Sequence, residues 1–150
     1  MTQRTFATRR QSVVAALVKK LKNINGTGQF LSDVDNNVEP RLKFWDEVDQ
    51  FPAVHINAGS ETREYQGGGY KDRFLSITLR CYVNTEDAAD ALDELLEDVE
   101  TVIEDNSALS YTDKRGASQK TQQITIVSID TDEGVLEPLG VGEMLIEVRY

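Results

Sequence analysis

The stretch Phe74-Leu-Ser-Ile-Thr-Leu-Arg-Cys-Tyr-Val83 decides the fold of this 150-residue chain. Apolar residues stand at every second position, and a β-strand turns successive side chains to opposite faces. The apolar face of the predicted strand holds Leu75, Ile77, Leu79, Cys81 and Val83. The opposite face holds Ser76, Thr78, Arg80 and Tyr82. We therefore expect the first face to be covered by other elements and the second to be exposed to solvent in a monomer.

A long acidic helix is predicted directly after this strand. It begins with Asn84 or Thr85 as its N-cap and runs to about Asp105. Residues 84–105 contain ten acidic residues and no basic residue, so the helix surface outside the apolar stripe is acidic. Apolar residues recur at helical spacing. They are Ala88, Leu92, Leu95, Leu96, Val99, Val102 and Ile103.

A second amphipathic helix is predicted near the N-terminus. It begins between Thr5 and Thr8 and runs to about Asn23, and Thr8 with Gln11 forms a capping box. Residues 1–32 contain six basic residues and no acidic residue. The two helices thus carry opposite charge. Solvated helix faces explain such runs, and so does a contact between the two faces.

Further strands are predicted on both sides of the acidic helix. Ala53–Ala58 alternates before it, and residues 123–130 and a last strand reaching Tyr150 follow it. Residues 27–37 and 106–122 are expected to be a loop and a polar linker. Residues 38–51 fit either an edge strand or one helical turn ahead of Pro52.

The connection between the two central strands, Gly59 to Arg73, is expected to be long and mobile. It contains the run Gly67-Gly68-Gly69, flanked by Tyr65 and Tyr70, and three glycines weaken any regular structure. An ordinary hairpin loop and a segment that becomes ordered on a partner both fit this composition.

These elements predict a single α+β domain over residues 1–150. The order is helix, two strands, helix, two strands. The economical arrangement is one mainly antiparallel or mixed sheet of about four strands, with both long helices on one face.

Composition argues against an enzyme or a tight nucleic-acid binder. The net charge is -10, with one His and one Cys in the chain. His55 is expected to be a polar surface or interface residue and Cys81 a core residue. Asp33–Val38 lacks the glycine of a calcium loop. No catalytic, metal or cofactor residues are predicted, and no segment is long and apolar enough to span a membrane.

The run Phe51-Pro52-Ala53-Val54-His55-Ile56, followed by Gly59-Ser60-Glu61 and the glycine-tyrosine segment, resembles the tail terminator (tail completion) proteins of long-tailed bacteriophages. The element order is similar too. The resemblance implies a structural virion protein whose hexameric ring caps the tail tube, ends its polymerisation and docks a head-side connector or stopper protein. It places the protein at the tail–neck junction, assembled in the host cytoplasm, with DNA passing through the lumen without specific binding.

Two sets of candidate contact residues follow. A ring closed by rotation uses two different patches on each subunit, and the two charged helices supply them. The subunit-interface candidates are Arg9, Arg10, Lys19, Lys20, Asp90, Glu94, Glu97 and Asp98. The candidates for contact with the tube or a neighbour are Tyr65, Gly67, Gly68, Gly69 and Tyr70.

Three alternative functions stay open from the sequence. One is a head-completion or connector protein of the same particle. Another is a small magnesium-dependent enzyme using Asp46, Glu47 and Asp49. The third is an adaptor domain that binds a basic partner through the acidic helix.

Overall fold

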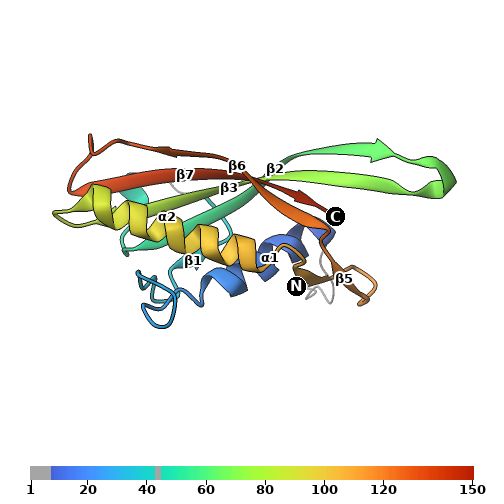
Figure 1. Cartoon of the computed structure of the whole chain (residues 1–150), viewed down its shortest axis with the longest axis horizontal. Coiled ribbons are helices and arrows are strands. Elements are labelled where there is room, and N and C mark those ends of the chain that lie inside the picture. Colours follow the sequence, from blue (N-terminus) through green and yellow to red (C-terminus); the bar gives the residue numbers. More distant parts are fainter. Residues whose placement is uncertain (1–7, 43–44) are drawn as a thin grey trace, which may run out of the picture.

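Two helices lie on one face of a long five-stranded sheet (Figure 1). The computed structural model describes residues 8–42 and 45–150. The helices are α1 (Arg9–Leu21) and α2 (Ala88–Asp105). The sheet has the order β1 (Val38–Glu39), β2 (Ala53–Tyr65), β3 (Lys71–Asn84), β7 (Leu139–Arg149) and β6 (Gln123–Thr131). The predicted α+β class with both helices on one face is confirmed.

The central strand is β3, which contains the alternating stretch. It pairs antiparallel with β2 on one side and with β7 on the other, so Ile77 lies between Ala58 and Ile146. The five apolar residues of its inner face are all buried. Each fully buried aliphatic side chain of this kind contributes about 1.5–3 kcal/mol.

Both helices cover that face with the apolar stripes that the sequence predicts. The capping box of α1 is present, because the Thr8 N–H donates to Gln11 Oε1 (3.0 Å) and the Gln11 N–H donates to Thr8 Oγ1 (3.2 Å). Thr5, the earlier predicted start, lies outside the described residues. The seven stripe residues of α2 are all buried. However, α2 begins only at Ala88, because β3 continues to Asn84 and Asp87 is the N-cap.

Two glycines of β7 let α2 approach the sheet closely. A Cβ on Gly140 would lie 2.7 Å from Val83 Cγ2 and 3.2 Å from the Ala88 carbonyl oxygen. A Cβ on Gly142 would lie 3.1 Å from Leu92 Cδ1. Any larger residue at these positions forces the helix away from the strand.

The strand count exceeds the expected four. The predicted linker over residues 106–122 contains a second, two-stranded sheet of β4 (Ser110–Thr112) and β5 (Ser118–Lys120). The buried Asp113 carboxylate closes this hairpin by accepting the N–H groups of Arg115 and Ala117. Its polar sequence therefore builds a turn rather than an irregular linker.

Residues 38–51 satisfy parts of both interpretations. β1 pairs in parallel with β2 over two residues, which makes the large sheet mixed. A 3₁₀ turn, η1 (Trp45–Glu47), follows it. Phe44, which fits both the predicted edge strand and the predicted helical turn, lies outside the described residues.

The face of the large sheet opposite the helices is only partly exposed to solvent, contrary to expectation. Tyr82 is 1% exposed and His55 is 3% exposed, and their rings meet edge to face at 5.3 Å. They lie beside a small cluster that includes Val48 and Ala53. The prediction of a surface His55 is therefore wrong, because the segment before β2 folds over this end of the sheet.

We predict that Gly140→Ala lowers the free energy of unfolding by about 1–3 kcal/mol, because the new methyl group meets a rigid Val83 side chain and backbone. Urea unfolding followed by circular dichroism measures the change. Gly67→Ala is the matched control, since a Cβ there meets nothing within 4 Å. Equal effects of the two substitutions would contradict close packing at Gly140.

Candidate assembly surfaces

A two-stranded arm extends from the sheet at one end of the molecule. We define it as residues 61–73. Within it β2 and β3 pair from Arg63 opposite Arg73 to Tyr65 opposite Lys71, while β7 ends opposite Phe74. Figure 1 shows this green hairpin extending beyond both helices along the longest axis. The prediction of a long mobile connection over residues 59–73 is therefore wrong, because most of these residues form paired strands.

The glycines form the turn at the arm tip. Gly68 and Gly69 have φ values of 78° and 84°, a conformation that residues with a Cβ rarely adopt. The Gln66 N–H donates to the Tyr70 carbonyl at 2.7 Å and closes the turn. The run of glycines thus allows a tight reversal of the chain.

Two tyrosines at the tip are presented to solvent. Tyr65 is 73% exposed and Tyr70 is 75% exposed. The Lys71 ammonium lies 5.8 Å from the centre of the Tyr65 ring, and the other residues of the tip are polar or glycine. Exposed aromatic residues on a supported hairpin are typical of anchor residues at protein interfaces.

The last residue of the chain fixes the base of the arm. The Tyr150 hydroxyl donates to the Glu61 carboxylate, which also accepts from Arg63 Nε at 2.8 Å. Burial alone would raise the pKa of Glu61, but these two hydrogen bonds and the Arg63 charge outweigh it and lower that pKa. Burial and the Glu61 contact raise the pKa of Tyr150.

Cationic side chains surround the same base. Arg149 Nη2 lies 2.9 Å from Asp72 Oδ2, and the Arg73 guanidinium lies 5.6 Å from the centre of the Tyr150 ring. From α1, Arg10 donates to the Gly59 carbonyl. Two segments outside the hairpin, α1 and the C-terminal end of β7, therefore contact the base of the arm.

The four basic interface candidates divide into two pairs. Arg10 contacts β2. Burial raises the pKa of Tyr111, and the nearby Arg9 charge offsets part of that rise. The same charge helps to lower the pKa of Asp113. Lys19 and Lys20 are exposed in the last turn of α1, where positive charge favours the helix dipole. The lysine pair is therefore the part of this set that stays available to a neighbour.

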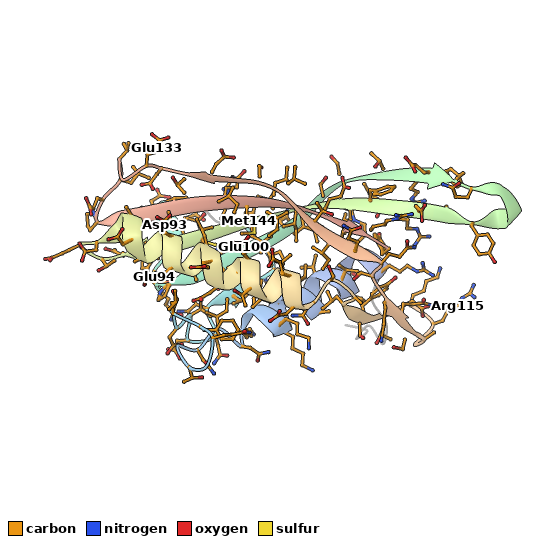
Figure 2. All side chains as sticks on the ribbon, viewed as in Figure 1. Asp93, Glu94, Glu100, Arg115, Glu133 and Met144 are labelled. Carbon is orange, nitrogen blue, oxygen red and sulfur yellow. The ribbon has the colours of Figure 1, made fainter. Side chains whose placement is uncertain are left out.

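The acidic candidates divide in the same way. Asp90, Glu94 and Glu97 are exposed and follow one another at helical spacing. Figure 2 shows other acids, Asp93 and Glu100, along the same helix as Glu94.

Asp98 is not part of this surface. It is 1% exposed and accepts the Leu31 N–H at 3.0 Å and the Ser32 N–H at 2.7 Å. The prediction of Asp98 as a subunit-interface residue is therefore wrong, because its carboxylate is buried and binds the backbone of the loop after α1. The sequence did contain a signal, since Asp98 falls at helical spacing between the buried Leu95 and Val102.

No metal centre or membrane-spanning helix emerges over the described ranges 8–42 and 45–150. No group of three or more potential ligand side chains is placed to hold a metal ion there. None of the helices in that part of the chain is long and apolar enough to cross a bilayer. Asp46, Glu47 and Asp49, the residues of the alternative magnesium-dependent enzyme, are thus not part of any such group among the described residues.

The comparison with protein families decides the class. The family described as Bacteriophage Tail Tube Terminator Protein matches residues 7–150. This chain belongs to that family. The tail tube terminator protein p142 of Escherichia phage T5 is 30% identical over 149 residues, covering 94% of this chain and 92% of the relative. Terminator proteins are structural, so the chain is a structural bacteriophage protein and not an enzyme.

The terminator fold also resembles a chain in the virion of a native gene transfer agent particle. That chain superposes with a TM-score of 0.56 at 9% identity, covering 93% of this chain and 94% of the other. At this identity the likeness concerns the fold alone.

We predict that Tyr150→Phe lowers the free energy of unfolding by about 1–2 kcal/mol at pH 7, because Glu61 loses a buried hydrogen-bond donor. The folded pKa of Glu61 lies below its ordinary 4.5, so its contribution is present above that pH and is lost as the pH falls through the folded pKa. Urea unfolding at pH 7 and pH 3 should therefore show a gap between wild type and variant that narrows in acid. Tyr70→Phe, at an exposed tyrosine, is the control. A gap that does not change with pH would contradict the role of ionised Glu61.

Proposed function

We propose that the chain forms a ring, hexameric as in the family resemblance, that caps the tail tube and ends its polymerisation. The observation that carries this proposal is the terminator family match across residues 7–150. It favours tube capping over a head-completion role. In this proposal the ring is a virion component at the tail–neck junction, assembled in the host cytoplasm.

The subunits contact one another through different patches in this proposal. Lys19 and Lys20 of one copy face Asp90, Glu94 and Glu97 of the next, and each set is exposed in the isolated subunit. Such a head-to-tail contact repeats around a closed ring. Because the patches are exposed, their attraction is screened by salt.

The arm makes the contact with the tail tube protein or with a neighbouring subunit. Tyr65 and Tyr70 supply apolar anchors, and the turn of Gly67, Gly68 and Gly69 holds them at the tip. The clamped base supports this role, because an arm that is already ordered loses less conformational entropy on binding.

The opposite side of the ring docks a head-side connector or stopper protein. DNA then passes through the lumen without specific binding. The net charge of -10 supports that feature, since an acidic protein does not hold phosphate groups.

We predict that Lys19→Glu with Lys20→Glu weakens the ring at least tenfold, because the reversed charges repel the acidic row of the next copy. Light scattering and negative-stain microscopy at two salt concentrations measure the ring fraction. Lys114→Glu with Arg115→Glu, in the β4–β5 turn, is the matched control. Adding Glu94→Lys and Glu97→Lys should restore the ring. A ring unaffected by the first pair would disprove the charge contact.

We predict that wild-type protein binds one end of purified tail tubes and that Tyr65→Ser with Tyr70→Ser binds at least tenfold more weakly. Both side chains are exposed, so the variant keeps its fold. Negative-stain microscopy counts capped ends, and Tyr65→Phe with Tyr70→Phe should restore capping. Failure of the wild type to cap tubes refutes the proposed function, whereas full capping by the serine variant refutes only the arm contact.

A further inference from the structure

The strand at one edge of the large sheet is open. β6 has nine residues and pairs with β7 on one side only. Val127 is 55% exposed and Ile129 is 43% exposed, and the strand contains no Lys, Arg or Pro. Native edge strands are normally protected by such residues, by shortness or by cover, because an open edge recruits another strand. A bulge between Ile126 and Ser128 and the exposed Asp130 near its end are protective features of this strand.

The other edge of the sheet is open at the arm. β1 covers β2 only at Val54 and His55, and Arg10 contacts the carbonyl of Gly59. Beyond that point no strand of the described residues lies against the outer side of residues 60–65. The sheet therefore has two different open edges, as a head-to-tail contact requires.

Strand direction makes these edges compatible. β2, β3, β7 and β6 alternate in direction, so β6 runs opposite to β2. A neighbour placed beside β2 in the same orientation presents its β6 antiparallel to it. The alternation then continues from one copy to the next, and the helices of both copies stay on the same side of the joined sheet.

We propose that β6 of one copy pairs with the outer edge of β2, over residues 60–65, of the next copy. The inference deepens the proposed ring function and names a backbone contact that complements the charged patches. Within one copy, Gln123 lies level with Phe74 and hence with Thr62. For β6 to pair with all of residues 60–65, the next copy therefore has to be shifted along the strand direction. Closing a sheet of tilted strands into a ring requires such a shift as well.

The first test places a charge on the open edge. Val127→Lys with Ile129→Lys is expected to lower the ring fraction at least tenfold by light scattering, because lysine on an edge strand opposes pairing. Val135→Lys with Leu136→Lys is the matched control, since these apolar residues are exposed in the β6–β7 turn. Circular dichroism checks that both variants fold. Equal ring fractions in the folded variants would overturn the proposal.

The second test does not depend on the stability of the lysine variant. Cys81 is buried and its burial raises the pKa of the thiol to about 12, so introduced cysteines react selectively. Val127→Cys is combined in turn with Ser60→Cys, Thr62→Cys and Glu64→Cys, and the protein is oxidised in the assembled state, on tubes where needed. We expect at least one pair to give a ladder of linked copies up to the closed ring.

Two outcomes of the cross-linking would overturn the edge pairing. One is a disulfide dimer of Val127→Cys alone, which indicates two copies joined β6 to β6. The other is the absence of a ladder for all three pairs in protein that assembles. If wild-type protein caps tubes while the ladder is absent, the edge pairing fails and the capping function stands. If wild-type protein does not cap tubes, the proposed function itself fails.

Discussion

The apolar face of β3 has to be kept from water, and the rest of the structure depends on how this is done. Leu75, Ile77 and Leu79 are each 0% exposed. The strand obtains its backbone partners from β2 and β7, and two helices of opposite charge cover its inner face. The glycines of β7 let α2 lie close to the sheet, and the helix keeps its apolar stripe inside and its acids other than Asp98 toward the outside. The packing of α2 against the sheet thus decides both which side chains form the core and which charges lie on the surface.

The same sheet also provides the long axis of the molecule. β3 belongs to the arm over residues 71–73 and to the core over residues 74–84, and β7 ends where these two parts meet. At that point Tyr150 contacts Glu61 across the base of the arm. This contact helps the projecting hairpin to stay ordered without a core of its own, because an isolated two-stranded hairpin is at best marginally stable in water.

Sequence periodicity predicted what depends on local pattern. The capping box at Thr8, the buried stripe of α2 and the buried face of β3 follow from spacing alone, and the structure confirms them. The misses depend on contacts between distant segments. The polar strands of the arm carry little hydrophobic pattern, so their pairing with each other was invisible. His55 is buried by the segment before β2, and no local pattern records that cover. Asp98 is buried by the loop after α1, and only its helical spacing between Leu95 and Val102 indicated its burial.

The net charge of -10 first argued only against tight binding of nucleic acid. The fold divides this charge into a basic patch at the end of α1 and an acidic row on α2, and burying Asp98 removes one member of the row. What remains exposed is short and screened by salt, so it can orient two copies but supplies little binding energy. The proposed ring therefore needs a stronger contact than this. Backbone pairing between open sheet edges supplies one, because each added strand satisfies a row of N–H and C=O groups that water otherwise holds.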